Sequence, residues 1–173
     1  MNLGLWAAAT TGVLIAIIGP VNAALQARLG TWGMVAVVHL LGLAVGVVGL
    51  LLFERGPAAA RADGTLRFLL LAGVVLALAV LAWAFRTAPD EGIPAFAFLG
   101  GVLGALVVVG TIVAIQHLGV LAALVTIVSS QLIAAALIDQ FGLFELPVIA
   151  LTPVRALGLL LVLAGVFMVA REG

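Results

Sequence analysis

A polytopic bundle of transmembrane helices, an all-α fold, is the fold class that the sequence predicts, and three observations predict it. Of the 173 residues, 66% are hydrophobic and only 8% are charged, and the mean hydropathy is +1.44. Ordinary soluble domains are roughly 45–50% apolar and about 25% charged. The apolar residues gather in six runs of about 20 residues, the length that a helix needs to cross a bilayer. Polar and apolar residues do not alternate within these runs, which excludes the strands of a membrane barrel.

The six predicted spans cover residues 3–27, 32–53, 66–85, 94–116, 118–139 and 153–170. Short connections join them, and the stretch ERGPAAARADGT (54–65) is one of the two longest, with residues 140–152 as the other. We see no convincing internal repeat in the sequence and expect one transmembrane domain over residues 1–173. A cleaved signal peptide is not expected, because MNLGLWAAATTG has no basic segment.

The arginines of the connections give almost no orientation bias under the positive-inside rule. Arg28, Arg86 and Arg155 fall on one predicted side, and Arg55, Arg61, Arg67 and Arg171 fall on the other. One interpretation is that both termini face the cytoplasm. The other is that the protein inserts in both orientations. We expect a homodimer, which is antiparallel under the second interpretation.

The first span contains the stretch IIGPVNAALQARLG, which turns polar after an apolar run. Pro20 cannot donate a hydrogen bond to the carbonyl of Ala16, so a helix break near Gly19 and Pro20 is expected. The free carbonyl would lie beside Asn22, on the helix face that also carries Gln26. Broken helices line substrate sites in transporters, but such side chains also bond neighbouring helices. The stretch therefore predicts either a polar cavity or a kinked packing face.

Two ionisable side chains lie near the first connection. Arg28 ends the first span, where a cation complements the negative end of the helix dipole. His39 lies inside the second span, where it either bonds a neighbour or takes part in proton coupling, since imidazole changes charge near neutral pH. We include His39 among the candidate cavity residues.

The fifth span carries the stretch VTIVSSQLIAAALIDQFG. Ser130 and Gln131 lie in its middle, and Asp139 lies near its C-terminal end, where the helix dipole disfavours an acid. Asp139 should therefore have a cationic partner, and Arg155 and Arg28 are predicted at the same membrane surface. The sequence leaves open whether this is a structural ion pair or a site for substrate or protons.

Composition and motifs exclude several other functions. The chain has no cysteine, so disulfides, zinc thiolates and cysteine nucleophiles are excluded. It has no phosphate loop, no HExxH motif and no nucleophile elbow, and its two histidines are too few for a metal cluster. Zero net charge and the lack of lysine argue against nucleic-acid binding. We expect a membrane protein that is not an enzyme and has no cofactor, with the bilayer and a small-molecule substrate as partners.

Four stretches give the sequence a resemblance to a known family. They are NAALQARLG (22–30), FLGGVLGALVVVG (98–110), QHLGVLAALVTIVSSQLIAAALIDQFGLFELP (116–147) and VRALGLLLVLAGV (154–166). They resemble the YdcZ-like family of small bacterial inner-membrane proteins in the drug/metabolite transporter superfamily. The resemblance implies a five-helix unit, transport as the activity, an oligomer and no cofactor. The run 66–85 would then be one extra span.

Two functions of different classes are compatible with these observations. The first is a secondary transporter that exports a small metabolite or lipophilic compound across the bacterial inner membrane. In that case the face of Asn22 and Gln26 and the face of Ser130 and Gln131 line one polar cavity. The second is a non-transporting scaffold or assembly partner, which needs no matched polar faces on two helices.

Overall fold

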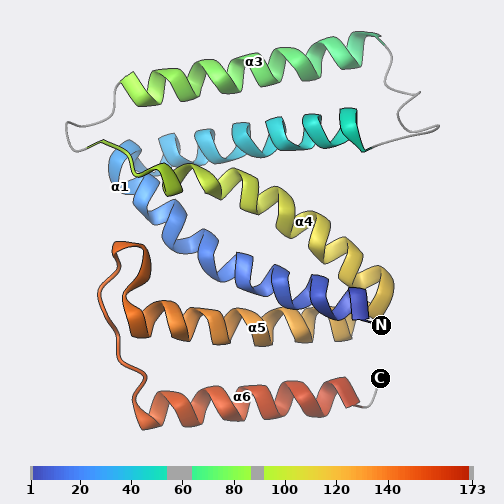
Figure 1. Cartoon of the computed structure of the whole chain (residues 1–173), viewed down its shortest axis with the longest axis vertical. Coiled ribbons are helices and arrows are strands. Elements are labelled where there is room, and N and C mark those ends of the chain that lie inside the picture. Colours follow the sequence, from blue (N-terminus) through green and yellow to red (C-terminus); the bar gives the residue numbers. More distant parts are fainter. Residues whose placement is uncertain (1, 54–63, 87–91, 172–173) are drawn as a thin grey trace. The chain divides into compact units, whose positions relative to one another are not determined.

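Helices make up almost all of the described chain (Figure 1). The computed structural model describes residues 2–53, 64–86 and 92–171. The elements are α1 (Asn2–Leu52), α3 (Gly64–Arg86), η1 (Ala95–Phe98), α4 (Leu99–Leu118), α5 (Val120–Phe141), η2 (Leu143–Glu145) and α6 (Pro153–Arg171). No strand occurs among these described residues, so the predicted all-α fold class is confirmed.

Four stretches of the described chain are long and apolar enough to cross a membrane. They are Leu3–Leu52, Gly64–Ala84, Ala95–Leu118 and Val120–Phe141, and a shorter apolar helix covers Pro153–Met168. The first stretch has 50 residues, which is about 75 Å of helix against about 30 Å of hydrocarbon. It is divided at Gly30, where the backbone leaves the helical conformation. All six predicted runs thus lie mainly in helices, and six membrane crossings stay a prediction.

Two glycines separate consecutive helices with nearly the same backbone conformation. Gly30 has φ 70° and ψ 170°, and Gly119, between α4 and α5, has φ 78° and ψ 165°. Only glycine adopts this region readily. At Gly19 and Pro20, where the sequence predicts a break, α1 keeps its helical assignment, and a kink at these residues stays a prediction. Proline removes one backbone hydrogen bond, a loss that membrane helices tolerate, whereas Gly30 changes the course of the chain.

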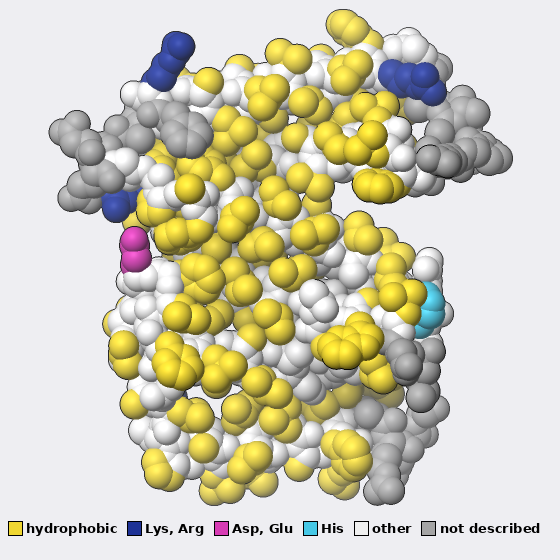
Figure 2. Space-filling view, in the orientation of Figure 1, with side chains coloured by type: hydrophobic (Ala, Val, Ile, Leu, Met, Phe, Trp, Pro, Cys, Tyr) yellow, Lys and Arg dark blue, Asp and Glu magenta, His cyan; other side chains and the backbone are white. Residues whose placement is uncertain are grey.

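Apolar side chains cover most of the visible surface (Figure 2). Many large ones are well exposed, such as Leu78 at 59%, Leu160 at 62% and Trp32 at 83%. Soluble monomers rarely expose continuous apolar surface on this scale. In a bilayer these side chains contact lipid, so the composition and the structure agree on a membrane protein.

The described helices form two compact units. Unit 1 comprises residues 1–20 and 106–173. Its buried core includes a cluster of Ala8, Ala114, Ala123 and Ile127. Here α1 and α5 come very close, because a Cβ atom on Gly12 would overlap the hydroxyl of Ser130 and the carbonyl oxygen of Ile127.

Unit 2 comprises residues 21–105. Its buried core includes a cluster of Leu25, Val37, Ala84 and Ala97. The second half of α1 and the start of α4 come equally close here, because a Cβ atom on Gly101 would overlap the carbonyl oxygen of Val38. The side chain of Leu41 and the backbone nitrogen of Gly42 lie beside the same position.

The contacts of the two units correspond at an interval of 89 residues. Gly101 lies 89 residues after Gly12, and the break at Gly119 lies 89 residues after the break at Gly30. Gly12 is surrounded by Ile127, Ser130 and Gln131, and Gly101 is surrounded by Val38, Leu41 and Gly42. Each member of the first set lies 89 residues after the corresponding member of the second. The chain is therefore built from two copies of one helical pattern.

We call residues 2–86 the first copy and residues 92–171 the second copy. The sequence retains only short traces of the repeat, such as GVLIA at 12–16 against GVLGA at 101–105. The expectation that the chain has no internal repeat is therefore wrong. Lipid-facing positions accept any aliphatic residue, so similarity survives mainly where helices touch or the backbone turns.

Candidate functional site

Several polar side chains of α5 are bonded within their own helix. The hydroxyls of Thr126 and Ser129 donate to the carbonyl oxygens four residues earlier at 2.8 Å, and Ser130 donates to those of Thr126 and Ile127 at 3.0 Å. Each hydroxyl keeps a free lone pair after this bond. The side chain of Gln131 makes no hydrogen bond with any described residue and is partly exposed.

The polar residues of α5 have apolar counterparts in the first copy. The residue 89 positions earlier is Val37 for Thr126, Leu40 for Ser129, Leu41 for Ser130, Gly42 for Gln131 and Leu50 for Asp139. The counterpart of Arg155 is Leu66. At the close contact that both units share, around Gly12 and around Gly101, Leu41 and Gly42 take the places of Ser130 and Gln131, so this helix contact does not require polar side chains. The second copy therefore carries chemistry that the fold alone does not explain.

A groove of about 320 Å³ lies between α5 and α6, inside unit 1. It is lined by Leu132, Ala135, Ala136, Asp139, Ile149, Leu151, Arg155, Gly158, Leu159 and Val162. All but two of these side chains are apolar or absent. The two exceptions, Asp139 and Arg155, carry opposite charges and lie at the end of the groove where α5 stops and α6 begins.

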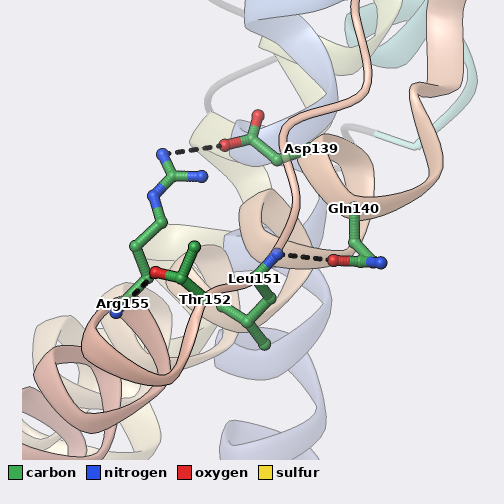
Figure 3. A network of polar contacts seen from close by, with 5 residues as sticks. All are labelled: Asp139, Gln140, Leu151, Thr152 and Arg155. Carbon is green, nitrogen blue, oxygen red and sulfur yellow. Dashed lines mark hydrogen bonds and ion pairs between the residues drawn. The ribbon is translucent and has the colours of Figure 1, made fainter.

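Asp139 and Arg155 form an ion pair across this end of the groove. A guanidinium nitrogen of Arg155 lies 3.6 Å from a carboxylate oxygen of Asp139, and the two side chains are 47% and 38% exposed, respectively. Figure 3 shows the guanidinium reaching toward the carboxylate. Sequence reasoning expected Asp139 to pair with Arg155 or Arg28. The structure brings Asp139 together with Arg155. A role of this pair in transport stays a prediction.

The connection between α5 and α6 is held beside the ion pair. The backbone nitrogen of Ile149 donates to the carbonyl oxygen of Asp139 at 2.8 Å. That of Leu151 donates to the side-chain oxygen of Gln140 at 2.6 Å (Figure 3). Thr152 accepts a hydrogen bond from the backbone nitrogen of Arg155 at 3.3 Å, as an N-cap residue does. These contacts fix the position of Arg155 at the start of α6.

Sequence reasoning missed Gln140 and Thr152. The role of Thr152 as an N-cap residue could have been predicted, because threonine followed by proline is a typical start of a helix. The role of Gln140 could not, because its bond depends on how the connection folds back. In that connection Phe144 and Glu145 have φ of 60° and 63°, which is unfavourable for residues with a side chain.

The other predicted site residues lie in unit 2. The side-chain nitrogen of Gln26 donates to the hydroxyl of Thr31 at 3.0 Å, across the break at Gly30. His39 is exposed, with a ring nitrogen 2.8 Å from the carbonyl oxygen of Val35. Arg28 is partly buried just before the break. The proposed roles of these residues in a cavity stay predictions.

Asn22 lies where α1 and α4 are in close contact in unit 2. Its oxygen is buried and accepts no hydrogen bond from the described residues. The oxygen occupies the space that a Cβ atom on Gly100 would need. It therefore packs directly on the backbone of α4, which fits a helix-packing role in this unit. The expected meeting of Asn22 and Gln26 with Ser130 and Gln131 stays a prediction.

Comparison with known proteins places the groove in a family context. A family model described as "Putative inner membrane exporter, YdcZ" matches residues 75–168. The match includes all of α4 and α5, both members of the ion pair and most of α6. It also begins inside α3, so the second half of the run 66–85 falls within the match. An extra span at 66–85 stays a prediction. No curated protein and no solved structure matches the chain. Because the match covers more than half of the chain, this protein belongs to the YdcZ family.

Proposed function

We propose that this protein is a secondary transporter that exports a small metabolite or lipophilic compound across the bacterial inner membrane. The observation that carries the proposal is the apolar groove between α5 and α6 with one ion pair at its end. Ligand sites are typically apolar clefts with a few polar groups that orient the ligand. The groove lies within the segment that matches the exporter family.

The ion pair supports transport better than a purely structural role. Exposed ion pairs typically contribute only about 0–1 kcal/mol to stability, and both side chains of this pair are more than a third exposed. The first copy also folds with leucine at both counterpart positions. Two charged groups at the end of an apolar groove therefore contribute little to folding, and we assign them to substrate binding.

Flux measurements test this proposal. The purified protein is reconstituted in proteoliposomes, and uptake is measured for a panel of small metabolites and lipophilic compounds. For a transported compound we expect Asp139→Asn to lower flux at least tenfold while the thermal unfolding temperature in detergent changes little. Glu145→Gln is the matched control, because Glu145 is an exposed acid on the same connection that does not line the groove.

The outcomes separate the possible roles of Asp139. Lower stability of Asp139→Asn with normal flux per folded molecule would make the pair structural. Equal flux in wild type, Asp139→Asn and Glu145→Gln would remove the pair from the transport site. The absence of flux for every compound of a broad panel would favour a non-transporting protein.

A further inference from the structure

The groove has a regular shape along both of its helices. Leu132, Ala135, Ala136 and Asp139 line it on α5, and Arg155, Gly158, Leu159 and Val162 line it on α6. Both sets have the spacing i, i+3, i+4, i+7, which places them on one helix face. Seven residues correspond to about 10 Å of helix, so the groove is about a third as long as the hydrocarbon of a bilayer is thick, which is about 30 Å. It is charged at one end and apolar along the rest.

Small residues keep the groove open. Ala135 and Ala136 face it from α5, and a Cβ atom on Gly158 would meet nothing within 4 Å. At the corresponding level of the first copy the helices touch, because a Cβ atom on Gly73 would lie 2.9 Å from the side chain of Leu43. These two residues are the counterparts of Val162 and Leu132, which line the groove. At this level the helices of the second copy are therefore separated by a groove where those of the first copy are in contact.

The charged end of the groove has unused binding capacity. The separation of 3.6 Å between Arg155 and Asp139 exceeds the roughly 2.7–2.9 Å of a charge-assisted hydrogen bond. Among the described residues, the guanidinium donates no hydrogen bond and the carboxylate of Asp139 accepts none. A guanidinium has five N–H donors. Both groups are thus available to a ligand that enters between them.

The end of α5 and the start of α6 strengthen the charge preferences of Asp139 and Arg155. Asp139 lies two residues before the end of α5, and Arg155 lies two residues after the start of α6. The C-terminal end of a helix favours a cation, and the N-terminal end favours an anion. The groove therefore presents a cation-binding group and an anion-binding group side by side.

We infer that this groove binds a small zwitterion with a single apolar tail. The ammonium of the ligand pairs with Asp139, its carboxylate pairs with Arg155, and its tail lies along Ala135 and Gly158. A singly charged ligand would leave one of the two protein charges uncompensated, whereas a zwitterion replaces both partners. The volume of about 320 Å³ is at the small end for ligand pockets, so the site takes one short tail and not a two-chain lipid. The inference rests on the proposed export function and names its substrate class.

Three probes with the same tail test the charge preference. They are 2-aminooctanoate, octanoate and octylammonium, titrated by calorimetry into the full-length protein in a non-ionic detergent. We expect 2-aminooctanoate to bind at least tenfold more tightly than either singly charged probe, because it makes one more charge-assisted contact. Arg155→Gln should reduce this preference over octylammonium to less than threefold.

A pair of glycine substitutions tests the place of binding. Gly158→Leu fills the groove and should abolish binding of 2-aminooctanoate. Gly165→Leu is the matched control, since Gly165 lies on the same helix outside the groove and its Cβ position is also free of neighbours. The control should bind as wild type does, and both variants should keep the thermal stability of the wild type.

Several results would overturn the inference. They are equal binding of octanoate or octylammonium, normal binding by Gly158→Leu, and displacement of 2-aminooctanoate by a two-chain phosphatidylethanolamine at equal concentration. The export proposal is judged separately. Binding of 2-aminooctanoate without its flux into proteoliposomes would support the site and overturn export, whereas flux of other compounds without such binding would overturn the ligand class and leave export intact.

Discussion

Gly12 shows how a single residue determines a helix contact in this protein. Its position against Ser130 and Ile127 leaves no room for a methyl group. We expect Gly12→Ala to destabilise the protein by about 1–3 kcal/mol, because overpacking forces α1 and α5 apart. Thermal or denaturant unfolding in detergent measures this.

Gly19 provides the control for that substitution. It lies on the same helix, and its Cβ position has no neighbour within 4 Å. Since alanine favours a helix over glycine by about 1 kcal/mol, Gly19→Ala should be neutral or stabilising. Equal effects of the two substitutions would mean that α1 and α5 are not in close contact at Gly12.

Individual charges were easier to interpret from the sequence than the groove beside them. An acid near the end of an apolar helix needs a cation, so chemistry and predicted sidedness limited the partner of Asp139 to Arg155 or Arg28. The structure shows that the partner is Arg155. The groove depends on Gly158 and on the way Leu151 and Gln140 tie the connection. No local pattern encodes that fold-back, so sequence reasoning could not find it.

At the scale of elements, the sequence located the helices better than their breaks. The predicted spans 118–139 and 153–170 compare with Val120–Phe141 and Pro153–Arg171, because long apolar runs define them. A local rule predicts a kink at Pro20, which stays a prediction. Sequence reasoning did not predict the break at Gly30, which depends on backbone angles that only glycine readily adopts.

The break at Gly30 gives a prediction at this scale. With φ 70° and ψ 170°, a side chain would be strained, so we expect Gly30→Ala to cost about 1–3 kcal/mol of stability. Gly119→Ala should behave alike, because Gly119 has nearly the same conformation in the second copy. Unfolding in detergent measures both.

A helical glycine separates strain from a general effect of alanine. Gly46 lies within α1 and has no neighbour near its Cβ position. Gly46→Ala should therefore be neutral or stabilising. A loss of stability at Gly46 as large as that at Gly30 would show that the backbone angles are not the cause.

At the scale of the whole molecule, the repeat predicts the orientation of the two copies. Each copy comprises three helices, since Gly30 divides α1 into two and α3 follows, while α4, α5 and α6 form the second copy. If every helix crosses the bilayer, an odd number of crossings starts the second copy on the opposite side. Inverted repeats of this kind are a common basis of alternating access in transporters. The polar residues lie on α5 and not on its counterpart, the part of α1 after Gly30. The second copy would then make the larger share of the ligand contacts.

Cysteine labelling tests this inverted arrangement. The chain has no cysteine, so Thr31→Cys and Val120→Cys each introduce one thiol, directly after the two equivalent glycines. Both positions are exposed. In intact cells, a membrane-impermeant maleimide should label one variant and not the other, because the two turns lie on opposite sides of the membrane. Labelling of both variants to about half would instead indicate insertion in both orientations, and full labelling of both, or of neither, would contradict inversion, because equivalent turns of inverted copies cannot share one side.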